Sequence, residues 1–148
     1  TLLTVGATTD ASRTTGESIG KYLNLDKLPG MCAKEPMTAD GIIRLSKIEV
    51  YPQYLDKYIN YATEVGEISL RTEPGVLTMY AVQEKENPCN ITILETYASN
   101  EAYRSHIASA HFQKYKQGTL HMVKNLQLLD QYLADIDAFH DRIMEKNA

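Results

Sequence analysis

The sequence predicts an α+β fold in which strands and helices follow the order β-α-β-β-α-α-β. Three observations predict it: short apolar and β-branched runs, longer segments with apolar residues at helical spacing, and breaking residues between them. The 148 residues, 43% hydrophobic and 23% charged, suffice for one domain with terminal extensions. We expect an N-terminal arm or linker over residues 1–40, a domain over residues 41–133 and a helical tail over residues 134–148.

The first half of the expected domain is a strand, a helix and a second strand. Residues 42–50 (IIRLSKIEV) are apolar and β-branched along most of their length, which is typical of a strand. Pro52 is tolerated at the start of a helix, and apolar residues then recur at helical spacing to about residue 71. Residues 73–75 (EPG) end this helix, and residues 76–84 (VLTMYAVQE) form the second strand.

The second half begins with a hairpin. Residues 85–90 form a polar connection of hairpin-loop length, and residues 91–97 alternate so that the odd-numbered positions share one face. Ser99 and Ser109 are good N-caps for two successive helices. A fourth strand is expected within residues 124–132.

This order of elements is the split β-α-β, ferredoxin-like arrangement, in which helices cover one face of a sheet. Because the expected strands are apolar on both sides, the other face must also be covered. A second copy of the chain is the simplest cover, so we expect a homodimer packed sheet to sheet, with the arm or tail exchanging contacts. Short helices are expected in the terminal segments, over residues 17–25 and 136–144.

Composition excludes several classes of partner. The net charge of −4, without a basic block, argues against nucleic acid or an anionic membrane as the main partner. No apolar run approaches the ~20 residues of a membrane span. Residues 1–16, rich in Thr, Gly and Ala, look like the segment after a secretory signal, so an exported or periplasmic location is slightly favoured over a cytoplasmic one. Cys32 and Cys89 could form a disulfide, although free thiols are the simpler interpretation.

The strongest functional signal is a group of proton-handling side chains within residues 91–112 (ITILETYASNEAYRSHIASAHF). Glu95 and Tyr97 stand at the end of a predicted strand, and His106 and His111 lie on or beside the helices that follow. Tyrosine is also over-represented, with 10 tyrosines, 2 phenylalanines and no tryptophan. Such a composition suits interfaces and pockets for aromatic ligands.

Residues 41–132 resemble the antibiotic biosynthesis monooxygenase superfamily of dimeric α+β barrels. The resemblance is carried by RLSKIEVYPQYLDKYINYATE, by EPGVLTMYAV, by ILETYASNEAYRSHIASAHF and by LQLLD. It implies one of several activities: cofactor-free oxidation of quinols with dioxygen, haem cleavage, or processing of a small phosphorylated sugar-like signalling molecule. The haem-cleaving members use a tryptophan, and this chain has none.

The leading hypothesis is therefore a cofactor-independent monooxygenase that oxidises a hydroquinone or hydroxylated aromatic with dioxygen. Such an enzyme needs a base near neutral pKa in a partly dry pocket. We expect His106 or His111 to be the base and Glu95 the acid that orients it. The expected substrate-binding residues are Arg44, Ser46, Tyr80, Tyr97 and Phe112.

Two other hypotheses remain open: an isomerase, epimerase or processing enzyme for a small polar carbonyl signalling compound, with or without a phosphate group, and a dimeric ligand-binding module without catalysis. Arg44, Arg104 and Lys114 are the cations that the isomerase would use. We expect no metal site, because residues five apart on one helix point about 140° apart and His106 and His111 could not share an ion. A break near Ser109 would change that geometry.

Overall fold

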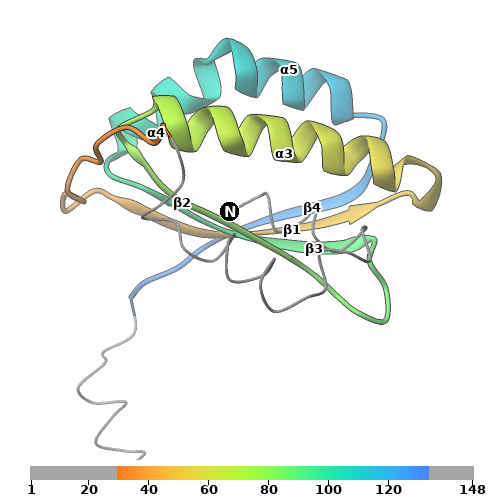
Figure 1. Cartoon of the computed structure of the whole chain (residues 1–148). Helices are drawn as coiled ribbons and strands as arrows, with labels where there is room; N and C mark the ends of the chain where they lie inside the picture. The colour runs from red at the N-terminus through yellow and green to blue at the C-terminus, as the bar shows by residue number, and fades with distance from the viewer. Residues whose placement is uncertain (1–29, 134–148) are drawn as a thin grey trace, which may run out of the picture.

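In the computed structural model, residues 30–133 are described, and they form one antiparallel sheet with helices on one face (Figure 1). The elements follow the expected order, and their bounds are: β1 Ile42–Val50, η3 Pro52–Tyr54, α3 Leu55–Thr72, β2 Val76–Gln83, β3 Asn90–Tyr97, α4 Asn100–Ala108, α5 Ala110–Thr119 and β4 Val123–Asp130. The helix expected from Pro52 begins with a turn of 3-10 helix before α3. The helices expected over residues 17–25 and 136–144 lie outside the described residues.

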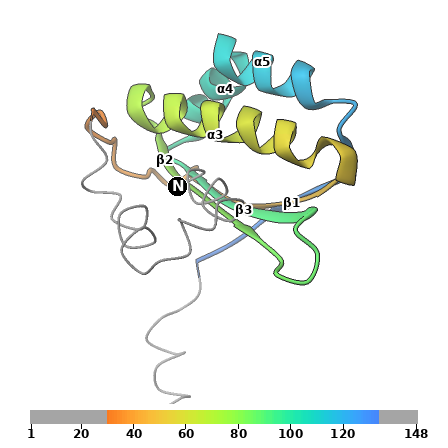
Figure 2. The same ribbon diagram turned by 45° about the vertical axis from the view of Figure 1, so that its right-hand side comes forward.

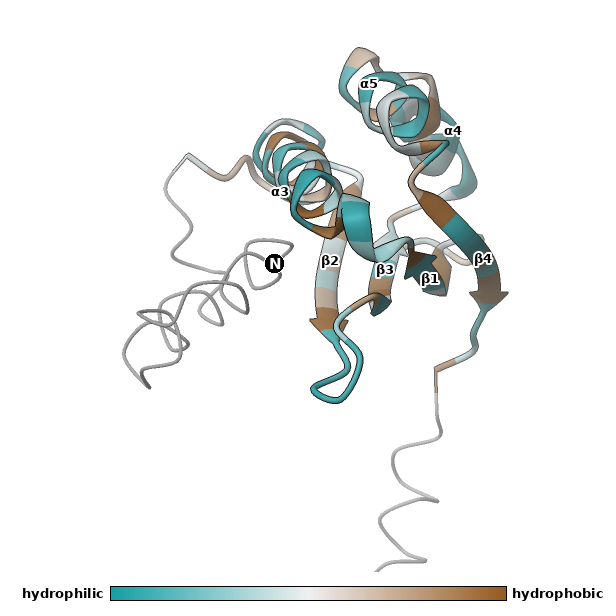
Figure 3. Ribbon diagram, turned by 90° about the vertical axis from the view of Figure 1, so that its right-hand side faces the viewer, coloured by the Kyte–Doolittle hydropathy of each residue, from teal (hydrophilic) through white to brown (hydrophobic). Residues whose placement is uncertain are grey.

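The strands have the spatial order β2-β3-β1-β4, and every neighbouring pair is antiparallel. This order confirms the ferredoxin-like fold. Helices α3, α4 and α5 all lie on the same side of the sheet (Figures 2 and 3). The chain therefore buries one face of the sheet and leaves the outer face without a layer from the described residues.

The core lies between the sheet and the helices. On β1, Ser46, Ile48 and Val50 alternate with more exposed residues and point toward the helices. On α3, the buried residues recur at helical spacing and include Tyr58, which is fully buried. The same periodicities that predict the elements from the sequence thus build the core.

A break at Ser109 separates α4 from α5. The backbone of Ser109 is extended, with φ −66° and ψ 150°. Its Oγ accepts a hydrogen bond from the Phe112 amide at 3.2 Å and donates one to the His106 carbonyl at 2.6 Å. Ser99 caps α4 in the same way, because its Oγ accepts from the Ala102 amide at 3.0 Å. Both expected caps are confirmed. Because α5 starts in a new direction after Ser109, His106 and His111 do not lie on one continuous helix.

The outer face of the sheet carries an apolar row that crosses all four strands. The row joins Tyr80, Leu94, Leu45 and Leu129, which are successive partners in the strand register. Leu94 is 37% exposed and Leu129 is 40% exposed. This confirms that the strands are apolar on both sides, as the sequence predicts.

Residues 30–40 run along the edge of the domain through backbone hydrogen bonds. The amides of Cys32, Glu35 and Thr38 donate to the carbonyls of Arg71, Pro74 and Ala98 at 3.0, 3.0 and 2.8 Å. Cys32 and Cys89 are both free thiols. None of the helices in residues 30–133 is long and apolar enough to cross a membrane.

Candidate active site

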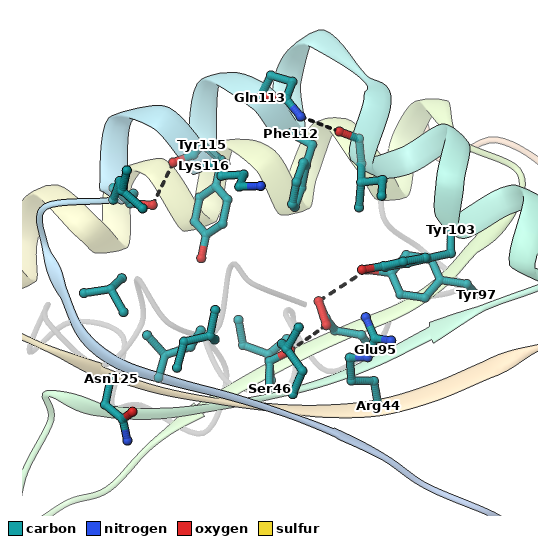
Figure 4. A pocket seen from close by; sticks show the side chains of 18 of the residues that line it. Arg44, Ser46, Glu95, Tyr97, Tyr103, Phe112, Gln113, Tyr115, Lys116 and Asn125 are labelled. Atoms are coloured by element: carbon teal, nitrogen blue, oxygen red, sulfur yellow. Dashed lines mark hydrogen bonds between the residues drawn. The ribbon is translucent and has the colours of Figure 1, made fainter.

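A cavity of about 530 Å³ lies between the sheet and helices α4 and α5, toward the β4 edge (Figure 4). Its lining is largely apolar and includes four aromatic rings, and β1 and β3 contribute the polar side chains of its floor. The lining residues include Arg44, Ser46, Glu95, Tyr97, Tyr103, Phe112, Gln113 and Tyr115. Five of the expected site residues are among them: Arg44, Ser46, Glu95, Tyr97 and Phe112.

Glu95 is the carboxylate on the cavity floor. Ser46 donates a hydrogen bond from Oγ to Glu95 Oε2 at 2.8 Å, and Tyr97 donates from its hydroxyl to Oε1 at 3.3 Å. Burial raises the pKa of Glu95, although the Ser46 hydrogen bond and the charges of His106 and Arg44 oppose the rise. A half-buried carboxylate with a raised pKa, facing a cavity, is a stronger base than an ordinary exposed carboxylate.

Arg44 supplies a fixed positive charge beside this carboxyl group. Its Nε is 2.7 Å from Asp130 Oδ1, and its guanidinium carbon lies 4.6 Å from the centre of the Tyr103 ring. The Arg44 side chain is only 12% exposed, whereas that of Asp130 is 70% exposed. The ion pair with β4 and the stacking on Tyr103 together hold the guanidinium at the cavity.

The tyrosines around the cavity act as neutral hydrogen-bonding groups. The hydroxyls of Tyr58 and Tyr115 are 2.6 Å apart, and burial raises the pKa of Tyr115 to about 12. Burial and the neighbouring Glu95 carboxylate also raise the pKa of Tyr97. These phenols keep their protons at neutral pH, so they can orient a ligand but cannot serve as its base.

The two histidines meet at a carboxylate other than the expected one. His106 Nδ1 and His111 Nε2 each lie 2.8 Å from Oε2 of Glu73, at the end of α3. The expectation that Glu95 orients the histidines is therefore wrong: Glu95 is hydrogen-bonded to Ser46 and Tyr97. The physical reason is that α4 places His106 against the turn after α3, and α5 starts in a new direction that aims His111 at the same point.

Neither histidine lines the large cavity. His106 is 1% exposed and packs against the rings of Tyr97 and Phe112, with ring centres 5.3 and 5.0 Å apart. A second, small cavity of about 30 Å³ is lined by both His106 and Glu95. It has room for about one water molecule. His106 therefore lies behind Glu95 and not beside a ligand in the large cavity.

Tyr80 lies apart from the other expected site residues. It pairs with Leu94 on β3, whereas its neighbour Met79 is buried and pairs with Glu95. Because strand residues alternate between faces, Tyr80 belongs to the outer face of the sheet. The one-residue difference in position decides the face, and the sequence of β2 is apolar on both sides.

Several residues of the site are not identified by the sequence reasoning. Glu73 is explained there only as part of a helix stop, although it is the partner of both histidines. Tyr103 could have been found, because it precedes His106 by three residues and so shares its side of α4. Gln113 and Tyr115 reach the cavity because α5 changes direction after Ser109, which periodicity alone does not describe.

Comparison with known proteins places this geometry in context. A profile described as antibiotic biosynthesis monooxygenase matches residues 41–118. The chain is similar to the crystal structure of a candidate antibiotic biosynthesis monooxygenase from Bacteroides thetaiotaomicron, with 52% identity and a TM-score of 0.63. That match covers 64% of this chain and 90% of the other. No curated protein matches the sequence.

Two further structures extend the likeness. A candidate monooxygenase from Lactobacillus acidophilus is 28% identical with a TM-score of 0.60, and the match covers 67% of this chain and 49% of that one. This chain thus spans about half the length of the Lactobacillus protein. A candidate antibiotic biosynthesis monooxygenase from Nitrosomonas europaea is 14% identical, with a TM-score of 0.60 and coverage of 69% and 98%. At that identity the likeness concerns the fold alone.

Proposed function

Because the chain belongs to the antibiotic biosynthesis monooxygenase family, we propose that it is a monooxygenase that oxidises a hydroquinone or a related hydroxylated aromatic with dioxygen. We propose that it does so without a cofactor. The observation that carries the proposal is the Glu95 carboxyl group, which has a raised pKa and lies on the floor of a cavity whose apolar walls include four aromatic rings. The relatives' names support oxygen chemistry, and the cavity supports the substrate class.

The first step is removal of a phenolic proton by Glu95. A hydroquinone is a weak acid and a poor reductant while it is protonated, but its phenolate transfers electrons to dioxygen readily. Glu95 accepts the proton on a carboxylate oxygen, while Ser46 and Tyr97 hold that carboxylate in place. Hydroquinone and dioxygen then give a hydroxyquinone and water, so atoms and electrons balance without another reductant.

The aromatic walls and the nearby cation would position the substrate. Tyr103 and Phe112 provide flat surfaces for a ring, and Gln113 offers an amide to a second oxygen substituent. The Arg44 guanidinium would stabilise the phenolate oxygen as its charge develops. The apolar lining, with four aromatic rings, favours an aromatic substrate over the phosphorylated substrate of an isomerase, although Lys116 and Lys124 also line the cavity.

His106 takes a supporting role in this proposal. It lies across the small cavity from Glu95, and its charge lowers the pKa of that carboxyl group. A water in this space would hydrogen-bond to both side chains. This assigns the base to Glu95, and it leaves His106 a positioning and electrostatic role beside that carboxyl group.

Oxygen uptake with a panel of reduced quinones, corrected for autoxidation, tests the proposal. We expect Glu95→Gln to lower kcat by about 10²-fold or more, the scale of a lost general base. Glu86→Gln, a change in the exposed loop between β2 and β3, is the matched control and should keep full activity. If the wild type shows no enzyme-dependent oxygen uptake across the panel, the oxygenase proposal is wrong. If Glu95→Gln and Glu86→Gln take up oxygen equally, a residue other than Glu95 is the base.

We also propose that the protein is a homodimer whose subunits pack through the outer faces of their sheets. The support is the apolar row of Tyr80, Leu94, Leu45 and Leu129, which crosses all four strands. An exposed apolar patch of this extent is typical of an interface. Because the patch belongs to one continuous sheet, a two-fold axis through it would bring identical rows together.

A further inference from the structure

Glu73, His106 and His111 form a compact cluster outside the large cavity. Each side chain offers one ligand atom, and the three atoms lie within 4.8 Å of one another. They are a Glu73 carboxylate oxygen, His106 Nδ1 and His111 Nε2. Both nitrogens are 2.8 Å from the same carboxylate oxygen. Two imidazoles and a carboxylate that converge on one point are the donor set that borderline divalent transition ions prefer.

Three separate elements build this convergence. Glu73 follows α3, and its backbone is held by Lys34, whose Nζ donates to the Glu73 carbonyl at 3.0 Å and to the Leu70 carbonyl at 2.6 Å. His106 comes from the last turn of α4, and His111 from the first turn of α5. The cluster is therefore fixed by the tertiary fold and by the break between α4 and α5.

A glycine permits the close approach of α4 to the turn that carries Glu73. A Cβ placed on Gly75 would lie 2.4 Å from the Cβ of Ala102, which is closer than such atoms pack. The absence of a side chain at Gly75 lets the two backbones approach, and this brings His106 within reach of Glu73. The approach of His106 to Glu73 depends on this contact.

The cluster also has a route for a cation from solvent. Glu73 lines an outward-facing cavity of about 380 Å³, together with Glu35 and Glu101. The Glu73 and His111 side chains are 16% and 18% exposed, whereas His106 is 1% exposed. Carboxylates at the mouth attract cations and raise their local concentration. The site is thus shielded on the His106 side and open on the Glu73 side.

We propose that Glu73, His106 and His111 bind one divalent first-row transition ion of the Zn²⁺ or Co²⁺ kind. An ion with bonds of about 2.0–2.1 Å needs ligand atoms roughly 3–4 Å apart, so a small rotation of the Glu73 carboxylate would admit it. His106 and His111 would turn their Nδ1 and Nε2 lone pairs to the ion and carry their protons on the other ring nitrogens. Solvent from the outer cavity would complete the coordination.

The site lies outside the cavity in which we place oxidation, and its test needs no substrate. The ring of His106 connects the two regions, because it also lines the small cavity shared with Glu95. Metal binding at Nδ1 would fix the His106 tautomer with its proton on Nε2. Groups that hydrogen-bond to this second ring nitrogen tune the metal affinity of a histidine ligand.

Calorimetric titration of the tag-free, metal-stripped protein with Zn²⁺ tests the proposal, and the visible absorption of added Co²⁺ reports the ligand field. We expect one ion per chain with saturable binding. Glu73→Gln and His111→Ala should each weaken the affinity by about 10- to 100-fold or more. These two variants are preferred to a change at buried His106, and circular dichroism should show that both remain folded.

His121→Ala is the matched control, because His121 is exposed and packs its ring against Tyr54 on the far end of the helical layer. Its affinity for Zn²⁺ should equal that of the wild type. Binding that disappears in His121→Ala but persists in His111→Ala would overturn the proposal, as would the absence of saturable one-to-one binding by the wild type. In either case the cluster would be a structural ion pair only.

Discussion

Ser46 Oγ lies 2.8 Å from Oε2 of Glu95, across the antiparallel pairing of β1 and β3. Both side chains point toward the helices, and Ser46 is 4% exposed. The hydroxyl donates a hydrogen bond that favours the charged carboxylate, whereas burial favours the protonated carboxyl group. This balance, more than the identity of the acid alone, sets the pH at which Glu95 can accept a proton.

Replacing Ser46 with alanine should change the pH dependence of oxidation. Loss of the hydrogen bond removes a term that favours the charged carboxylate, so the pKa of Glu95 should rise further. We expect the acid limb of the kcat profile to move to higher pH, with activity largely recovered in alkaline buffer. Ser105→Ala on the exposed side of α4 is the control and should leave the profile in place. An unshifted profile in Ser46→Ala would show that another group titrates.

The raised pKa of Glu95 also predicts how stability varies with pH. An acid whose pKa is higher in the folded state binds more protons there, so its stabilising effect is complete below the unfolded value of 4.5. That effect is lost as pH rises through the raised folded-state pKa. Glu95→Gln has no such loss, so it should gain in free energy of unfolding relative to the wild type as pH rises from 4 to 8.

Urea unfolding of both proteins at several pH values would measure this difference. The exposed change Glu86→Gln should run parallel to the wild type throughout. A constant offset between Glu95→Gln and the wild type would mean that the folded-state pKa of Glu95 is not raised. This experiment needs no substrate, so it separates the electrostatics of the site from the identity of the reaction.

The fold could be predicted from the sequence because each element has a local cause. The alternation of residues 91–97, the caps at Ser99 and Ser109 and the stop at residues 73–75 each act within a few residues. Glu95 on the cavity face follows from the same alternation. These features are properties of short segments, so no knowledge of the tertiary structure is needed to find them.

The pairing of the histidines could not be predicted, because it depends on contacts between distant segments. Glu73 precedes His106 by 33 residues and His111 by 38. The argument that two histidines five residues apart diverge holds for one continuous helix, and the break at Ser109 removes that condition. The expectation that Tyr80 lines the site fails for another reason: β2 is apolar on both faces, so its composition does not tell which residues point inward.

The outer apolar row predicts a change in oligomeric state. Leu94 lies at the middle of the row, with Tyr80 and Leu45 as its partners in the register. A lysine there would place an unpaired charge in the proposed interface, which is strongly unfavourable. We expect Leu94→Lys to convert a dimer to a monomer, as measured by light scattering after size exclusion.

Thr92→Lys gives the matched control, because Thr92 lies two residues along β3 and pairs with Val82 and Lys47, outside the row. It should leave more of the dimer intact than Leu94→Lys does. A monomeric wild type would show that the outer face is not a dimer interface. A dimer that persists in Leu94→Lys would show that the subunits associate through another surface.

The hydroxyl pair of Tyr58 and Tyr115 predicts an asymmetric cost of mutation. The two oxygens are 2.6 Å apart, and Tyr58 is fully buried, whereas Tyr115 lines the large cavity. Tyr115→Phe leaves the Tyr58 hydroxyl without this partner in a dry site, which should cost about 1–3 kcal/mol of unfolding free energy. Tyr58→Phe leaves the Tyr115 hydroxyl where cavity water can reach it, so its cost should be smaller.

The double variant Tyr58→Phe/Tyr115→Phe removes both polar groups and retains both rings. Because a buried pair that is removed together leaves no orphaned donor, it should be more stable than Tyr115→Phe alone. Urea unfolding of the four proteins would give the coupling free energy directly. Equal losses in the two single variants would mean that the hydroxyls are equally accessible to water, and the wall of the cavity near Tyr115 would then be drier than its position on α5 implies.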